Sequence, residues 1–114
     1  MNNAQIVRFE ALRSLAFGSI SGTYAAIGSA LTHACRMIGI DNLTDVNVTI
    51  SFNGSTDHTV IPPGSGKIFD FSTNRAEPVG FLELPSNTTV YAKQTSGAPS
   101  SGSVYVTVMY ASTT

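Results

Sequence analysis

The residues Gly64–Lys67, with the sequence GSGK, resemble the end of a phosphate-binding loop and suggest nucleotide chemistry. The full motif has a glycine separated from the Gly-Lys pair by four residues, and a serine or threonine directly after the pair. This chain has Ile61 and Ile68 at those positions. The motif also needs a helix whose N-terminal amides face the phosphates, whereas residues 68–71 (IFDF) alternate like a strand. We therefore expect no nucleotide and no other cofactor.

A turn explains the same stretch better than a binding loop does. Pro62 and Pro63 are expected to end one strand, because proline fixes φ and has no N–H to donate. Gly64 and Gly66 permit positive φ, and Lys67 begins the next strand as a surface charge. Replacing Lys67 with alanine is expected to leave folding intact.

His33 and Cys35 are two residues apart, so on a strand they would project to the same side and could begin a zinc site or a nucleophilic dyad. A zinc site needs two more ligands, but His58 is far along the chain and no Cys-x-x-Cys pair is present. A dyad needs an orienting group and an oxyanion loop, and the sequence shows neither. We expect a packed Cys35, no catalytic residue, no metal-binding residue and no enzymatic activity.

Three carboxylates, Asp41, Asp45 and Asp57, lie in predicted turns that could meet around a calcium ion, because calcium prefers oxygen ligands. Aspartate is also a turn former, since its side chain bonds nearby backbone N–H groups. That role already explains these residues, so calcium is the weaker interpretation.

Residues that could carry or bind sugars form a last group. Four Asn-x-Ser/Thr sequences would carry glycans only in a secreted protein. Arg8, Glu10 and Arg13 interrupt the apolar run that a secretion signal needs, so none is expected. The tyrosines could offer a sugar platform in a chain without tryptophan, but packing in the core or at an interface is favoured. The glycosylation sequences begin at Asn42, Asn47, Asn53 and Asn87, and the tyrosines are Tyr24, Tyr91, Tyr105 and Tyr110.

Composition limits the class of protein that these residues serve. The chain has 114 residues, enough for one domain, and its single cysteine excludes an intrachain disulfide. Charged residues make up only 11% of the chain and the net charge is -1, without a Lys/Arg cluster. We therefore expect no specific nucleic acid and no membrane as partners. A charge-poor surface loses less hydration when it is buried, which suits a subunit of an assembly.

Periodicity predicts an all-β fold. Residues 46–52 (VNVTISF) and 101–111 (SGSVYVTVMYA) alternate apolar and polar side chains, as half-buried strands do. Asn53-Gly54 predicts a tight reversal after the first of them, with a returning strand at 56–61. Short β-rich runs separated by turn formers lie between the two. These runs are 67–71, 80–84 and 88–94.

The first 40 residues are compatible with two periods. Ile6, Phe9 and Leu12 have helical spacing, whereas the β-branched opening suits an extended segment. We expect an N-terminal arm or short helix over residues 1–15 and a single β domain over residues 16–114. The domain is predicted to be an antiparallel β-sandwich or a jelly-roll-like barrel. Within it we expect a strand at 31–40, a turn at 41–45 and a mobile hairpin tip at 95–102.

Residues 42–71, followed by STN and later by GSVYVTVMY, resemble small β-structured virion proteins of tailed bacteriophages. In those proteins a strand, an Asn-Gly or Asp-Gly turn, a short returning strand and a Pro/Gly turn recur before a C-terminal strand that contains tyrosine. The resemblance spans about two thirds of the chain. It implies a non-enzymatic structural protein of the capsid, used in many symmetric copies as a decoration or cement subunit or at the head-tail junction. The resemblance identifies no functional residue in this sequence.

The expected partners follow from that resemblance. They are copies of the chain itself and other virion proteins, such as major capsid or portal and tail proteins, in a virion that is assembled in the host cytoplasm. The apolar side chains of the arm, which order on binding, form the candidate subunit interface of the homo-oligomer. Deleting residues 1–15 is then expected to leave a folded domain that no longer assembles. The alternative is a glycan- or receptor-binding β-sandwich module. The candidate interface residues are Ile6, Val7, Phe9 and Leu12.

Overall fold

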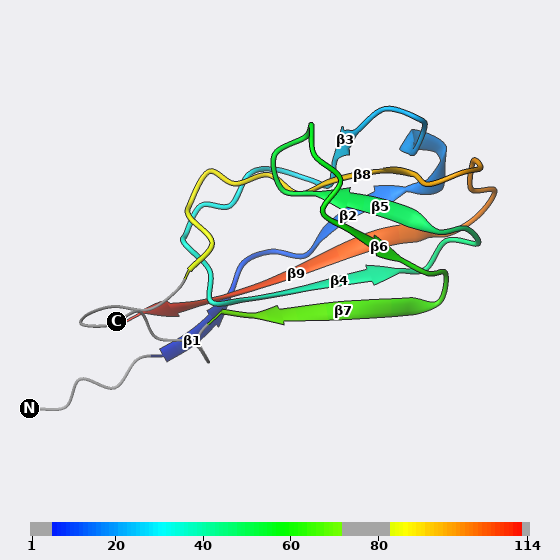
Figure 1. The fold of residues 1–114 in the computed structure, drawn as a ribbon. Helices are drawn as coiled ribbons and strands as arrows, with labels where there is room; N and C mark the ends of the chain where they lie inside the picture. Colours follow the sequence, from blue (N-terminus) through cyan, green and yellow to red (C-terminus); the bar gives the residue numbers. More distant parts are fainter. Residues whose placement is uncertain (1–5, 72–82, 113–114) are drawn as a thin grey trace, which may run out of the picture.

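Two antiparallel sheets pack face to face in the computed structural model, which describes residues 6–71 and 83–112 (Figure 1). In sheet A the order is β1-β9-β4-β7, with β2 also paired to β9; in sheet B it is β3-β8-β5-β6. The prediction of an antiparallel β-sandwich is confirmed. The strands of sheet A are β1 (Ile6–Phe9), β2 (Arg13–Ala16), β4 (Met37–Asn42), β7 (Ser65–Asp70) and β9 (Ser103–Ser112). Those of sheet B are β3 (Ala25–Ala26), β5 (Val48–Ser51), β6 (Thr59–Ile61) and β8 (Tyr91–Gln94).

The core lies between the sheets and is built from alternating side chains. From Val104 to Val108 every second residue of β9 is buried, and the paired residues of β4 are buried with them, because directly opposed residues point to the same face of a sheet. Sheet B contributes apolar side chains from β5, β6 and β8 to the same cluster. The largest fully buried apolar side chains are Ile27, Leu31, Ile38, Ile40, Ile50, Ile61, Val48, Val90, Val104, Val106 and Val108.

The first residues form strands, so the alternative of a short helix is wrong. Ile6–Phe9 and Arg13–Ala16 both pair antiparallel with β9, one after the other along the same edge (Figure 1). The backbone groups of β9 offer these residues hydrogen-bond partners along a whole strand, whereas a short isolated helix has little stability of its own. The helical spacing seen in the sequence produces no buried stripe, because Ile6, Phe9 and Leu12 are all exposed.

Two connections also differ from expectation. The predicted strand at 31–40 begins only at Met37, because the backbone of Leu31 and Cys35 bonds residues 84–88 instead, including an isolated bridge between Cys35 and Leu84. Residues 95–102 join β8 of sheet B to β9 of sheet A, so they cross between the layers and are not a hairpin tip. The predicted run at 80–84 lies largely outside the described residues.

The turn that ends β6 is confirmed, with one change. Gly64 has φ of +74°, as expected, but Gly66 lies inside β7 opposite Asp41. A Cβ on Gly66 would collide with the Asp41 carboxylate and the Ile40 carbonyl oxygen, so close packing requires this glycine rather than positive φ. Lys67 donates a hydrogen bond to the Thr59 hydroxyl at 2.8 Å. In the part of the chain that the structure describes, no helix is long and apolar enough to cross a membrane.

Candidate functional site

The predicted interface residues are exposed but do not share one surface. Val7, Phe9 and Leu12 expose 62–66% of their surface, and Ile6 is exposed as well. Val7 and Phe9 pair with Ala111 and Met109 on the side of sheet A that faces away from the core. By alternation Ile6 points to the opposite side of β1, and Leu12 lies in the link between β1 and β2. The structure therefore brings Val7 and Phe9 together on one side of the sheet, with Ile6 beside Val7 in the lining of one hollow and Leu12 apart from them.

Residues that are far from Val7 and Phe9 in the sequence complete an apolar surface around them. The register places Phe9, Met109 and Met37 in one row across three strands, and Asp70 continues this row on β7. On the next strand Ile68 is 69% exposed and leans over Gly39, which offers no side chain of its own. Four of the outward residues border a hollow of about 230 Å³, which Ile6, Arg36 and Tyr110 also line; the four are Val7, Met37, Met109 and Ala111. We call these outward residues the sheet A patch: Val7, Phe9, Met37, Ile68, Met109 and Ala111.

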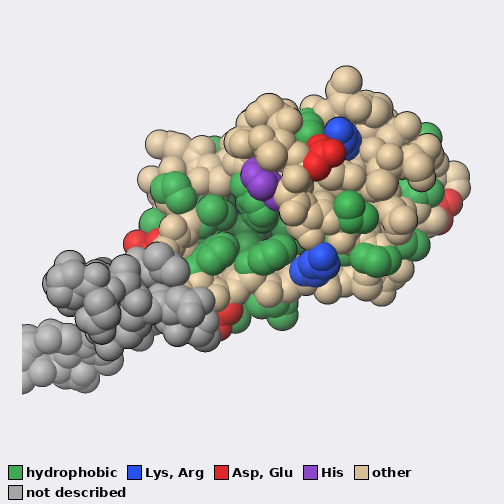
Figure 2. Space-filling model, in the orientation of Figure 1, with side chains coloured by type: hydrophobic (Ala, Val, Ile, Leu, Met, Phe, Trp, Pro, Cys, Tyr) green, Lys and Arg blue, Asp and Glu red, His purple; other side chains and the backbone are tan. Residues whose placement is uncertain are grey.

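The outer face of sheet B has a different chemistry. On the outward side its register groups Thr49 with Lys93 and Val60, and Ser51 with Tyr91, although Thr49 and Ser51 themselves are buried. At one end of this face, Asp57 accepts a hydrogen bond from the Tyr24 hydroxyl and pairs with Lys93 Nζ at 3.1 Å. Figure 2 shows how few and scattered the charged side chains are on the side it presents. The two faces thus differ in polarity, although neither is rich in charge.

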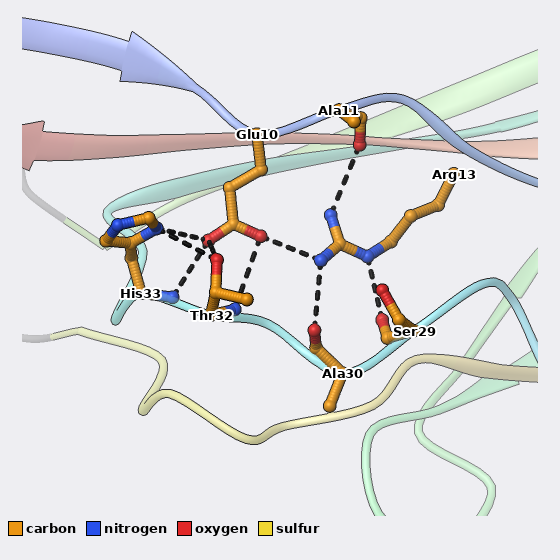
Figure 3. A network of polar contacts seen from close by, with 7 residues as sticks. All are labelled: Glu10, Ala11, Arg13, Ser29, Ala30, Thr32 and His33. Carbon is orange, nitrogen blue, oxygen red and sulfur yellow. Dashed lines mark hydrogen bonds and ion pairs between the residues drawn. The ribbon is translucent and has the colours of Figure 1, made fainter.

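A buried polar network fixes the link between β1 and β2 to the loop at 29–33 (Figure 3). The Glu10 and Arg13 side chains are only 5% and 8% exposed, and Arg13 Nη2 donates to Glu10 Oε1 at 2.7 Å. Arg13 also donates to the carbonyl oxygens of Ser29 and Ala30, at 2.8 and 3.0 Å. Because the guanidinium is shared between a carboxylate and three carbonyls, the third being that of Ala11 at 3.3 Å, its burial is compensated.

The other Glu10 oxygen is held from the same loop. It accepts hydrogen bonds from the Thr32 hydroxyl at 2.9 Å and from the His33 backbone N–H at 2.8 Å, and it lies 2.7 Å from His33 Nδ1. The His33 ring stacks on Tyr110 with centroids 3.8 Å apart. Burial raises the pKa of Glu10, but hydrogen bonds from His33, Arg13 and Thr32 outweigh it and lower the pKa to about 2. The carboxylate is therefore ionised throughout the neutral range.

Sequence reasoning missed this network. Its only local signal was the presence of Glu10 and Arg13 three residues apart in an otherwise apolar segment. Their partners are 16–23 residues away, and no local spacing predicts them.

The candidate nucleophile and zinc ligands are not assembled into a site. Cys35 is fully buried, and burial followed by the nearby charges of Glu10 and Glu83 raises its pKa to about 11, so the thiol is protonated. His33 does have an orienting carboxylate, Glu10, which the sequence did not show. Over residues 6–71 and 83–112, no three His, Cys, Asp or Glu residues are placed to hold a metal ion.

The remaining candidates have structural partners of their own. Asp45 is bonded to Ser100, Asp57 to Tyr24 and Lys93, and Asp41 lies on β4, so the three carboxylates do not converge. Asn42 of the first glycosylation sequence is fully buried. Its amide donates to the carbonyl oxygens of Val46 and Ile61, and its Oδ1 accepts from Thr44, which ties the turn to sheet B. A glycan at Asn42 is incompatible with these contacts.

No protein-family model matches the chain, and no curated protein matches it significantly. A function is therefore inferred from the fold and the chemistry of the surface.

Proposed function

We propose that this protein is a non-enzymatic structural subunit of a tailed bacteriophage particle, either a capsid decoration or cement protein or a component of the head-tail junction. The observation that carries the proposal is the sheet A patch, an outward apolar face on a rigid sandwich. Isolated apolar side chains are normal on a protein surface, but six in one cluster indicate a surface that is covered in the working state.

The energetics of the patch suit multivalent attachment. Burying one Val, Ile or Phe side chain contributes about 1.5–3 kcal/mol. A few such contacts give each subunit a modest affinity for one site. Because a particle presents many equivalent sites, the contacts of many subunits together stabilise the assembly. The scarcity of charge on the surface reduces the desolvation penalty of docking.

The assignment to a virion is supported by the resemblance of residues 42–71 and 102–110 to small phage virion proteins. The segments that carry it form β5, β6, β7 and β9, and the two turns that the resemblance includes join β5 to β6 and β6 to β7. The proposed partners are major capsid or portal and tail proteins, met in the host cytoplasm and retained in the virion.

The test is the copy number of the chain in purified particles, measured by quantitative mass spectrometry. A structural subunit is expected at a fixed, high number of copies per particle. The double variant Val7→Ser/Phe9→Ser is expected to fold normally and to be depleted from particles several-fold. The matched control, Val60→Thr, removes an exposed valine from β6 and should be incorporated normally. Absence of the wild-type chain from particles would refute the proposal.

One observation favours a second candidate, a glycan- or receptor-binding module. A polar hollow of about 450 Å³ lies on sheet B beside the Tyr24–Asp57–Lys93 cluster, with Thr49, Gln94 and Thr95 in its lining. Hydroxyl and amide groups next to an aromatic ring are what a saccharide requires. This candidate predicts saturable binding on a glycan array by the isolated domain, weakened by Lys93→Ala and unaffected by Phe9→Ser.

A further inference from the structure

Among the described strands, one sheet edge is left open over a long stretch. β3 has two residues, β6 has three and is followed by Pro62, and the β1–β2 edge is interrupted at residues 10–12. Short and interrupted edges are those that proteins use to prevent strand addition. β7 runs for six residues without interruption, and only β4 pairs with it in the part of the chain that the structure describes. It lies at the lower margin of sheet A in Figure 1.

The direction of the backbone groups on β7 follows from one hydrogen bond. The Phe71 N–H donates to the Arg36 carbonyl oxygen at 2.8 Å, and this pair continues the β4–β7 register. Hydrogen-bonded pairs alternate along an antiparallel ladder, so Phe69 and Lys67 direct their N–H and C=O groups toward β4. Ile68 and Gly66 then direct theirs away from the sheet, toward the open edge.

We propose that β7 pairs antiparallel with β7 of a second copy about a two-fold axis at Ile68, which joins sheet A of both copies into one continuous sheet. In this arrangement the N–H and C=O of Ile68 bond those of Ile68 in the second copy. The two Ile68 side chains lie side by side on the outer face, and Gly66 lies opposite Asp70 of the second copy.

The sequence of β7 selects this register. A two-fold axis perpendicular to the sheet pairs the outward residues of one strand with outward residues of the other. The possible registers are therefore those in which one residue of β7 lies opposite its own copy. Centred at Lys67, the pairing would place the two Lys67 side chains directly opposite each other, which is unfavourable for like charges. Centred at Phe69, it would leave Gly66 beyond the end of the partner's strand and shorten the ladder. The Ile68 centre pairs residues 66–70, all of β7 except Ser65, and opposes Lys67 to Phe69.

Side chains along the edge permit such an approach. Ile68 is 69% exposed, and Gly66 has no side chain. Lys67 is the charged residue that would otherwise disfavour the addition of a strand at this edge, but its hydrogen bond to Thr59 turns it toward β6. The interface is isologous, as most homodimer interfaces are, and it leaves most of the sheet A patch available to other partners.

A cysteine pair tests the register in the full-length chain. Opposed residues of a hydrogen-bonded pair have Cα atoms about 5.5 Å apart, within the range of a disulfide. Ile68→Cys is expected to form a covalent dimer under mild oxidation or with a short thiol cross-linker, and Lys67→Cys is not. Val60→Cys, exposed on β6, controls for random collision. Native Cys35 is fully buried and does not interfere. Cross-linking of Lys67→Cys in place of Ile68→Cys would refute the register.

Sedimentation equilibrium tests the dimer itself. The wild-type chain is expected to be dimeric and Ile68→Pro monomeric, because proline removes an N–H that points to the open edge and spares those that bond β4. Ile68→Asp, which opposes two like charges, should also be monomeric, and Val60→Thr should remain dimeric. A monomeric wild type, or a dimer that both Ile68 variants retain, would overturn the proposal. Since no particle is involved, these results are independent of the test of the virion role.

Discussion

The two halves of the N-terminal segment lie on the same strand, β9, but have opposite environments. All four residues of β1 are exposed, and their pairing with β9 is the main contact that they make. From Glu10 onward, by contrast, the Glu10 and Arg13 side chains are nearly excluded from water, although Leu12 between them stays exposed. The contrast indicates that the segment has two roles: residues before Glu10 present a surface, and residues from Glu10 to Ala16 belong to the folded body.

Paired truncations give the largest effect that separates these roles. Removing residues 1–15 would delete Glu10 and Arg13 and most of β2, so we now expect that chain to be unfolded or aggregated. Removing residues 1–9 spares the network and is expected to reduce the free energy of unfolding by less than about 2 kcal/mol. Circular dichroism and urea unfolding would distinguish the two. Equal stability of both truncated chains would show that the network contributes little.

Arg13→Ala is expected to have the next largest effect. It would leave the buried Glu10 carboxylate without its cation, a change that costs about 3–5 kcal/mol. Arg8→Ala, at an exposed position of β1, is the control and should cost less than about 1 kcal/mol. Urea unfolding at pH 7 measures both.

The double variant Glu10→Gln/Arg13→Met extends that test. It removes the buried charge together with its partner and should recover much of the loss. If it is no more stable than Arg13→Ala, an uncompensated charge is not the cause.

Acid should weaken the fold through the same carboxylate. The pKa of Glu10 is lowered to about 2 in the folded chain from its ordinary value of 4.5, so the folded state holds fewer protons between these values. The stabilisation is complete above about pH 5 and is lost as the pH falls toward 2, by about 3 kcal/mol at most. Urea titrations at pH 6 and pH 3 should show this loss in the wild type and a smaller one in Glu10→Gln.

The smallest effect on stability is expected for a substitution in β1, the exposed half of the N-terminal segment. Phe9→Ser should change the free energy of unfolding by less than about 0.5 kcal/mol, because the Phe9 ring is largely exposed in the free subunit and the substitution removes few contacts. A loss above 2 kcal/mol would mean that Phe9 is part of the core and that the contrast between the halves is wrong.

The sequence predicted those elements whose signal is local. The alternation at 46–52 and 101–111 became β5 and β9, and Asn53 accepts hydrogen bonds from the Ser55 and Thr56 N–H groups in the predicted reversal. It did not predict β1 and β2, because their conformation depends on pairing with β9 at the far end of the chain. The sheet A patch was predicted only at Val7 and Phe9, since the register that adds Met37, Met109 and Ile68 is set by tertiary pairing.

The central position of β9 in sheet A has a consequence for biosynthesis. β1, β2 and β4 all pair with β9, which follows every other described strand in the sequence and is therefore translated after them. Contacts of such high sequence separation form late and slowly. A ribosome-bound chain that lacks β9 therefore cannot display Phe9, Met109 and Met37 as one row. The docking that we propose for that row is therefore open only to chains whose sandwich is complete.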